Sequence, residues 1–150
     1  MEINGFRHKY SVKVQFHEVD LLGVCNNAIY FNFFETARLE YLKTIGQYKE
    51  MEDALNSQEF YLIVHNECDY LEPAYYDDEL NIYSRVKYIK NSSFCFEHVI
   101  ENNSTKKIIA KGNAVIVYIN RKLKKSIPIP DEFYEKVKSF DEAVEILKGS

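Results

Sequence analysis

The stretch AIYFNFFETARLEYLKTI, residues 28–45, determines how this chain is organised. Placed at about 100° per residue, its polar side chains gather on one side and its apolar side chains gather opposite them. The polar side holds Asn32, Thr36, Glu40, Lys43 and Thr44, and the apolar side holds Tyr30, Phe34, Ala37, Tyr41 and Ile45, widened by Phe31, Leu39 and Leu42. An apolar sector this wide predicts a long helix that a curved sheet wraps around.

Both ends of the predicted helix carry boundary signals. Asn26 and Asn27 stand directly before it, where their side chains can cap the first turn. Gly46 follows it, at a position where a left-handed residue ends a helix. Arg38 projects into the apolar sector, and Glu35, three positions earlier, can pair with it. We interpret this pair as a framework or subunit contact, because buried charges are kept when they have a partner.

Strand-like alternation occurs on both sides of this helix. Residues 11–16 place apolar side chains at every second position, which predicts one strand. After a polar loop over residues 47–59, four further strands are predicted at residues 61–70, 79–89, 93–101 and 107–119. Their links are too short for crossovers, so these four strands should be antiparallel. Residues 131–148 resemble one or two short helices. The predicted fold is therefore α+β, with a five-stranded antiparallel sheet wrapped around one long helix and a short helical C-terminal tail.

Composition limits the class of protein. The 150 residues suit a single domain, 1–150, and the 46% hydrophobic and 15% aromatic content predicts a packed core. A net charge of -4 argues against nucleic acid as the main partner. The N-terminus does not resemble a secretory signal, and no apolar run approaches the roughly 18 residues of a membrane span, so we expect a soluble, cytoplasmic protein. Three cysteines without a CxxC spacing predict free thiols, and Cys25 is interpreted as a packing residue rather than a nucleophile.

Several kinds of site are absent from the sequence. It contains no glycine-rich phosphate loop, no Gly-x-Ser-x-Gly elbow and no metal-ligand spacing, so no metal is expected. A structural or exposed role is the default for the four scattered histidines, His8, His17, His65 and His98. What remains is Asp20, in the loop before the helix. A carboxylate beside unpaired helix-start amides suits acyl transfer, although by spacing alone an aspartate here is usually a cap or loop residue.

A longer pattern runs through this region: Asp20-x-x-Gly23-x-x-x-Asn27-x-x-Tyr30-x-x-x-x-Glu35-x-Ala37-Arg38. It resembles the 4-hydroxybenzoyl-CoA thioesterase-like family of hot-dog proteins. The resemblance extends over nearly the whole chain, through residues 69–74, 78–80, 90–94, 110–112 and 127–130.

The resemblance implies an acyl-CoA thioesterase in which Asp20 is the nucleophile or general base. A backbone N–H near Asn27 would polarise the thioester carbonyl. Tyr30 and Arg38 match positions that we interpret as packing and framework. The candidate substrate-binding residues are Gly23, Val24, Tyr30, Lys87, Lys90 and Ser92, with Lys90 and either Lys87 or Arg85 meeting the CoA phosphates. These basic side chains are equally well explained as solvated strand charges.

The family resemblance also implies partners. Coenzyme A is part of the substrate, and no separate cofactor is expected. Two protomers would join their sheets, with the active sites at the dimer interface, and tetramers are common in the family. This chain has Asn27 where some members have His, and Ile29 where they have Asn, a departure that bears on the substrate more than on the reaction.

Three other functions are retained beside acyl-CoA hydrolysis. The chain could act on acyl-carrier-protein thioesters, or bind acyl-CoA without turning it over. A hydratase or dehydratase is disfavoured, because no histidine and acidic residue pair in the helix-start motif.

Overall fold

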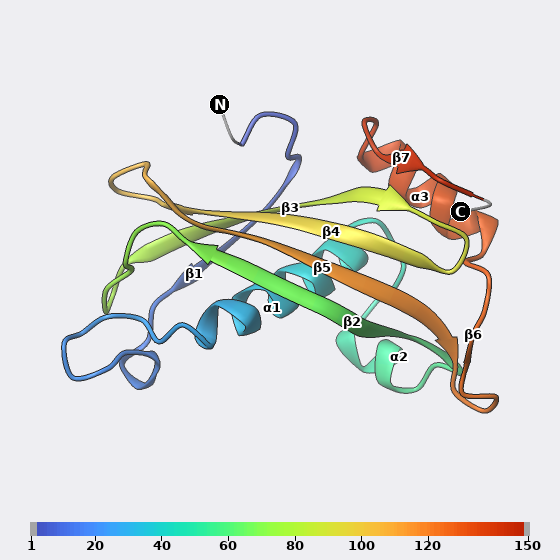
Figure 1. The fold of residues 1–150 in the computed structure, drawn as a ribbon, viewed down its shortest axis with the longest axis horizontal. Helices are drawn as coiled ribbons and strands as arrows, with labels where there is room; N and C mark the ends of the chain where they lie inside the picture. Colours follow the sequence, from blue (N-terminus) through green and yellow to red (C-terminus); the bar gives the residue numbers. More distant parts are fainter. Residues whose placement is uncertain (1–2, 149–150) are drawn as a thin grey trace.

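One antiparallel sheet curves around one long helix in the computed structural model, which describes residues 3–148 (Figure 1). The helices are α1 (Ile29–Thr44), α2 (Met51–Leu55) and α3 (Asp131–Phe140), and a 3-10 turn covers Phe16–Glu18. The strands are β1 (His8–Lys13), β2 (Glu59–Tyr70), β3 (Glu79–Ile89), β4 (Ser93–Asn102), β5 (Ile108–Asn120), β6 (Lys125–Ser126) and β7 (Glu145–Ile146). This arrangement confirms the predicted α+β hot-dog fold.

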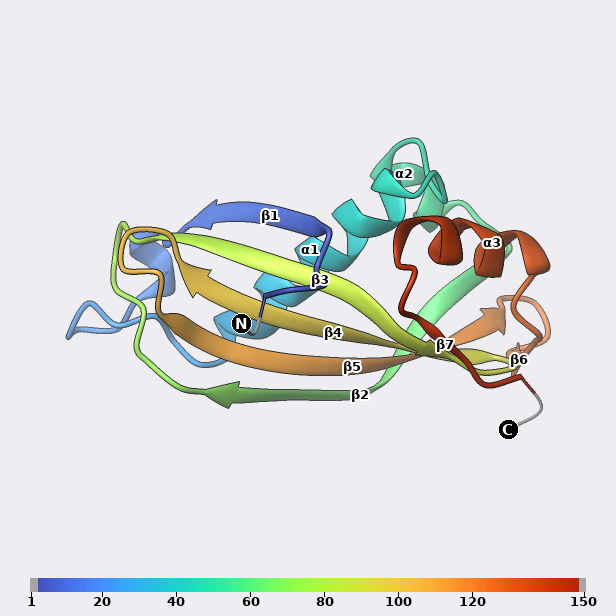
Figure 2. The same cartoon turned by 90° about the horizontal axis from the view of Figure 1, so that it is seen from above.

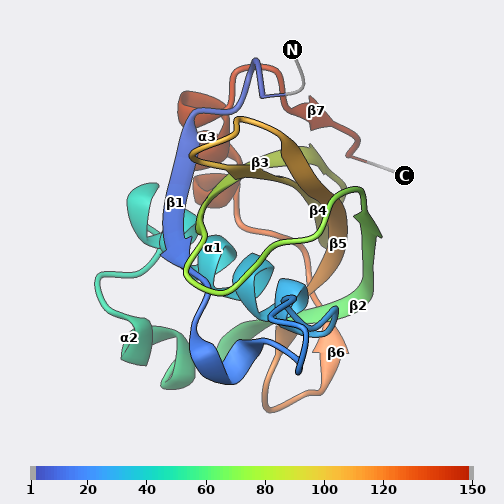
Figure 3. The ribbon, with the colours of Figure 1, turned by 90° about the vertical axis from the view of Figure 1, so that its left-hand side faces the viewer.

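The five main strands lie in the order β1-β3-β4-β5-β2, and the short β6 and β7 pair with β5 and β3. Viewed from the end at which α1 begins, the sheet encloses the helix on most of its circumference (Figure 3). The loop that leads into α1 lies at one end of the molecule, and α2 and α3 lie at the other (Figure 2). β2 pairs with β5 only, among the strands that the structure describes, so its outer edge is open.

Aromatic contacts fix α1 against the inner face of the sheet. Phe34 is fully buried, and its ring stacks on that of His98 in β4 with the centroids 4.8 Å apart. Gly112 of β5 lies under the same ring, where an added Cβ atom would come within 2.4 Å of Phe34. Farther along the helix, Tyr41 packs edge-on against Phe96 at 5.0 Å. These contacts hold α1, and therefore the loop before it, in one position relative to the sheet.

The predicted bounds of the first strand are wrong, because β1 covers His8–Lys13 instead of residues 11–16. Its pairing with β3 ends at Lys13↔Glu79. The backbone N–H of Gln15 then donates to the Glu18 carboxylate at 2.7 Å, which closes a 3-10 turn. Phe16 continues the apolar alternation in the sequence, but its side chain is 77% exposed.

Two connecting segments also differ from the prediction. The polar loop predicted at residues 47–59 contains α2, which begins with a capping box between Glu50 and Asp53. The tail forms one helix, α3, which agrees with the prediction of one or two short helices. Its last part is the short strand β7, which pairs in parallel with Tyr88 and Ile89 of β3.

Of the two predicted boundary signals of α1, the one at its C-terminal end is confirmed and the one at its N-terminal end is wrong. Gly46 has the predicted left-handed conformation, with φ of 84°. The prediction of side-chain caps at Asn26 and Asn27 is wrong, because the cap residue is Ala28 and no side chain caps the helix. Backbone carbonyls of the preceding residues close the first turn instead.

Arg38 is buried on α1, as predicted for a framework residue. Burial lowers the pKa of its guanidinium to about 10, and the negative charge of Glu35 opposes this shift. The predicted ion pair is an electrostatic interaction rather than a contact salt bridge: within residues 3–148, the Arg38 side chain makes no hydrogen bond or salt bridge. None of the helices in residues 3–148 has the length and hydrophobicity of a membrane-spanning segment.

Candidate functional site

Asp20 begins a tight hairpin before α1. Its backbone N–H donates to the carbonyl of Val24 at 2.9 Å, and its carbonyl accepts from Gly23 at 3.0 Å. Gly23 has φ of 77°, a left-handed conformation that glycine adopts without a Cβ penalty. The carboxylate Oδ1 accepts the N–H groups of Leu22 at 2.8 Å and Val24 at 3.1 Å. One carboxylate oxygen therefore builds the hairpin, and Oδ2 makes no hydrogen bond within residues 3–148.

The first turn of α1 leaves two backbone donors available. The N–H groups of Ile29 and Tyr30 donate to the carbonyls of Asn26 at 3.0 Å and Asn27 at 3.3 Å. By contrast, the N–H groups of Asn27 and Ala28 donate to no group in the part of the chain that the structure describes. Free amides at a helix start attract negative charge, because the helix dipole points its positive end there.

A small cleft of about 210 Å³ is lined in part by Asn27. It lies where the hairpin, the start of α1 and the loop after β2 meet. Its lining includes three residues predicted from the sequence, Val24, Asn27 and Tyr30, together with Cys25, Tyr70, Leu71, Glu72 and Pro73. Asp20 and Gly23 are not part of this lining; Val24 is the hairpin residue that reaches it, so the structure places the Asp20 hairpin next to the helix start.

Tyr70 is a residue of this cleft that the sequence analysis missed. Its hydroxyl donates to the carbonyl of Asn27 at 2.8 Å, and its ring packs edge-on against Tyr30 at 5.1 Å. No spacing signal links the end of β2 to the start of α1. Only the curvature of the sheet brings them together.

Cys25 and Tyr30 form the buried wall of the cleft. Burial raises the pKa of the Cys25 thiol to about 12, and the charge of Glu18 adds to the shift. The thiol is therefore protonated at neutral pH, which agrees with a packing role. Burial also raises the pKa of Tyr30.

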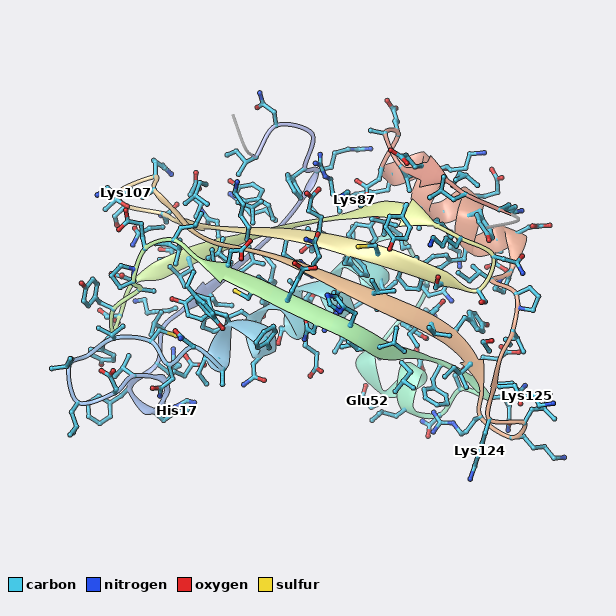
Figure 4. All side chains as sticks on the ribbon, in the orientation of Figure 1. His17, Glu52, Lys87, Lys107, Lys124 and Lys125 are labelled. Atoms are coloured by element: carbon cyan, nitrogen blue, oxygen red, sulfur yellow. The ribbon has the colours of Figure 1, made fainter. Side chains whose placement is uncertain are left out.

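Lys87, Lys90 and Ser92 lie far from this cleft in the same protomer. Lys87 is eight residues beyond Glu79, the start of β3, which corresponds to about 26 Å of strand. It lines a different groove of about 710 Å³ together with Arg7 and Arg85. In Figure 4, Lys87 is well separated from His17, which marks the loop that leads into α1.

The densest cluster of positive charge was not singled out in the sequence. Arg121, Lys122 and Lys124 occupy the exposed turn between β5 and β6, and the exposed Lys125 begins β6. Lys124 and Lys125 project from the end of the molecule opposite His17 (Figure 4). The Arg121 guanidinium is tied to this end through the carbonyl of Ser57 at 3.0 Å.

The four histidines lie outside the lining of the cleft. His98 is fully buried, and its Nδ1 lies 2.8 Å from the Ser84 hydroxyl. Burial lowers the pKa of His98 well below its usual range, and burial also lowers that of His8. His17 and His65 are exposed.

Large apolar side chains surround the Asp20 hairpin on the surface. Leu21 and Leu22 at its tip are fully or mostly exposed. Other exposed apolar side chains at this end, together forming the apolar rim, are Phe16, Tyr70, Leu71, Tyr75 and Tyr76. A patch of this kind marks a surface that a ligand or another protein covers.

Comparison with known proteins gives consistent results. Residues 14–137 match the model of the family described as the thioesterase-like superfamily. The chain is 31% identical to a putative esterase of Aquifex aeolicus over 130 residues, which cover 86% of this chain and 96% of that protein. It is 28% identical to the acyl-CoA thioesterase YbgC of Haemophilus influenzae, with coverage of 86% and 91%. A Thermus thermophilus thioesterase crystallised with coenzyme A and zinc superposes with a TM-score of 0.79 at 27% identity, covering 93% and 97% of the two chains.

Proposed function

Because the chain belongs to the thioesterase-like superfamily and is a thioester hydrolase, we propose that it hydrolyses acyl-CoA thioesters at the cleft beside Asp20. The observation that carries this proposal is that one carboxylate oxygen and two helix-start amides are all unused. The Oδ2 atom of Asp20 and the N–H groups of Asn27 and Ala28 lie on the two segments that meet at the cleft, and none of them is engaged elsewhere within residues 3–148.

The proposed chemistry follows from these two groups. The N–H of Asn27 donates to the thioester carbonyl oxygen and stabilises the negative charge that develops on it. Asp20 Oδ2 takes a proton from water as the water oxygen bonds to the carbonyl carbon. The C–S bond then breaks, the thiolate of coenzyme A receives that proton, and the free acid remains. Alternatively, Oδ2 attacks the carbon itself, the C–S bond breaks and coenzyme A leaves as its thiolate, so that a mixed anhydride forms. Water then adds to the acyl carbon of the anhydride, which releases the free acid and the Asp20 carboxylate, and the thiolate takes the proton that the water loses.

Substituting Asn for Asp20 tests the proposal without disturbing the hairpin. Asparagine keeps an Oδ1 acceptor for the N–H groups of Leu22 and Val24, but it loses the negative charge. We expect kcat to fall by at least about 100-fold, with an unchanged unfolding midpoint, in an assay of free thiol released from acyl-CoA. Near-normal turnover by Asp20→Asn would remove the mechanism.

Contact with the phosphates of coenzyme A is proposed to come from a second protomer. Lys87 and Lys90 are too far along β3 to reach a substrate held by Asp20 of the same chain. The open edge of β2 can pair with β2 of another copy, because an unpaired strand edge is a template for a strand. An isologous antiparallel pair would put Tyr70 at the end of one β2 beside Glu59 at the start of the other.

Such a dimer would also cover Tyr70, the one residue of the apolar rim that lies on β2. Val64, which is 57% exposed on β2, lies near the middle of the open edge. We expect Val64→Asp to lower the oligomeric state in light scattering and to lower activity with it. A Val64→Asp variant that remains oligomeric and active would exclude this interface.

The role of Lys90 in binding the CoA phosphates has its own test. Lys90→Glu should raise KM for CoA esters more than it lowers kcat, and an unchanged KM would remove Lys90 from the phosphate site.

A second candidate is hydrolysis of thioesters carried on an acyl carrier protein. The exposed basic turn of residues 121–125 supports it, because an acidic carrier would be attracted there. Parallel assays with the same acyl group on coenzyme A and on acyl carrier protein separate the two substrates. Reversing the charges of Lys124 and Lys125 should then lower kcat/KM for the carrier-protein substrate more than for the CoA ester.

A further inference from the structure

One charged side chain, that of Glu72, lines the cleft beside the Asp20 hairpin. The other seven lining residues within residues 3–148 carry no charge at neutral pH, since burial keeps the Cys25 thiol protonated. A sphere with the volume of this cleft, 210 Å³, is about 7 Å across, which is shorter than the Debye length of about 8 Å at physiological ionic strength. A charge on an acyl group bound in the cleft therefore interacts with the Glu72 carboxylate.

The backbone holds Glu72 at the cleft. The N–H groups of Leu71 and Glu72 both donate to the carbonyl of Ile109, at 2.9 and 3.1 Å. Pro73 follows, and a proline restricts the residue before it to extended conformations. The Glu72 carboxylate itself makes no hydrogen bond or salt bridge within residues 3–148. Its charge thus stays beside the cleft, and no cation in contact with it neutralises it.

The segments around the cleft add to this negative charge. They lie within residues 14–37 and 66–84, which together contain nine Asp and Glu residues and no Lys or Arg. One of the nine, Asp77, is paired with Lys13 at 3.7 Å. Positive charge for the phosphates of coenzyme A has to come from other parts of the chain. The acyl end of the substrate is the part that meets this negative region.

From this placement we infer that Glu72 makes the cleft selective against acyl groups that carry a negative charge. The cleft accepts neutral acyl groups and acyl groups with an ammonium group near the thioester, and it rejects those with a carboxylate there. A repulsive charge gives specificity without tighter contact to the preferred substrate. This inference rests on the proposed thioesterase function and names its substrate class.

Three CoA esters of similar size test the selection. Butyryl-CoA is neutral, β-alanyl-CoA has an ammonium group in place of the terminal methyl group, and malonyl-CoA has a carboxylate at that end. We expect kcat/KM for the first two esters to exceed that for malonyl-CoA by at least about tenfold. Equal rates for the three esters would overturn the inference and leave the hydrolase intact. A wild-type protein that hydrolyses no acyl-CoA would overturn the proposed function, and this inference with it.

Substitutions at Glu72 assign the selection to one carboxylate. Glu72→Gln should lower the ratio of kcat/KM for butyryl-CoA to that for malonyl-CoA by at least about fivefold, and Glu72→Lys should reverse the order of β-alanyl-CoA and malonyl-CoA. Asp69→Asn is the matched control. Asp69 is also an exposed carboxylate, but it lies outside the lining and on the face of β2 opposite to Tyr70. An unchanged ratio in both Glu72 variants, or an equal change in Asp69→Asn, would overturn the role of Glu72.

Salt separates an effect of charge from an effect of shape. Glu72 is exposed, so dissolved ions screen its charge. Raising sodium chloride from about 0.05 M to about 0.5 M should lower the wild-type ratio toward that of Glu72→Gln and leave the ratio of Glu72→Gln nearly unchanged. Both esters carry coenzyme A, so the effect of salt on its phosphates cancels in the ratio. A wild-type ratio that does not respond to salt would overturn the electrostatic selection.

Discussion

Adding a single methyl group at Gly112 should disrupt the contact that holds α1 against the sheet. An ideal Cβ atom there would lie 2.4 and 2.7 Å from two ring carbons of Phe34 and 2.8 Å from the carbonyl oxygen of Glu67. Carbon atoms pack best at about 3.5–4.0 Å, so the overlap with the ring exceeds 1 Å by this standard. Phe34 cannot retreat, because it is fully buried and its other neighbours include the stacked ring of His98.

We therefore expect Gly112→Ala to lower the free energy of unfolding by about 3 kcal/mol, at the upper end of the cost of overpacking. For a chain of this size, that loss corresponds to a decrease in Tm of about 6–12 °C. Urea titration followed by fluorescence and circular dichroism measures the loss, and an unchanged m-value would show that the two-state transition is retained.

Two controls separate steric overlap from other effects of removing a glycine. Gly46→Ala places a Cβ atom where no other atom lies within 4 Å, so its cost of about 1–2 kcal/mol should come from the left-handed backbone alone. Phe34→Leu combined with Gly112→Ala should cost less than the sum of the two single changes, because the smaller side chain makes room. A loss below about 0.5 kcal/mol in Gly112→Ala, or strict additivity in the double variant, would refute the proposed steric role of Phe34.

Three further predictions concern other contacts. Burial keeps His98 neutral in the native state, whereas in the unfolded chain it takes up a proton below its usual pKa of 6.5. The free energy of unfolding should therefore be unaffected by His98 above pH 6.5 and should fall by about 1.4 kcal/mol per pH unit below it. Urea midpoints that stay constant below pH 6.5 would contradict this prediction. Tyr41→Phe leaves the buried Asp141 carboxyl without a hydroxyl donor and should cost about 1–3 kcal/mol in the same unfolding assay, whereas an unchanged midpoint would make that hydrogen bond dispensable. Tyr70→Phe should lower kcat with little effect on Tm, because Tyr70 is 41% exposed and its hydroxyl donates to the Asn27 carbonyl at the cleft. A fall in Tm without a fall in kcat would show that Tyr70 stabilises the fold instead of the cleft.

The periodicity of the chain predicted its larger elements because burial alone decides them. The wide apolar sector of α1 corresponds to a helix enclosed by the sheet, with Phe34 and Tyr41 fully buried. The alternation of residues 79–89 likewise predicted the exact bounds of β3. Periodicity failed where one hydrogen bond decides the local structure. The hydrogen bond between the Gln15 N–H and the Glu18 carboxylate forms a turn directly after the first strand, and the pattern of apolar residues does not predict that hydrogen bond.

The site was predictable only in part, because the cleft depends on contacts between distant segments. Asp20 and Asn27 belong to one local motif, and the sequence brings them together. Tyr70 reaches Asn27 across 43 positions, and only the curvature of the sheet determines that approach. The distance of Lys90 from the cleft could not be read from its spacing either, because it follows from the length of β3.

The sequence offered two readings of Asp20, a loop-forming residue and a catalytic carboxylate, and the geometry of the hairpin makes them compatible. The two oxygens of a carboxylate need not share a role. Oδ1 accepts two backbone N–H groups and holds the hairpin closed, so the side chain is fixed in orientation before any substrate arrives. That fixed orientation favours a base over a mobile surface charge, because a catalytic group acts best when its geometry is set in advance. The same bonds explain why Asp20→Ala would be a poor test: it would remove the hairpin acceptor together with the charge, whereas Asp20→Asn removes only the charge.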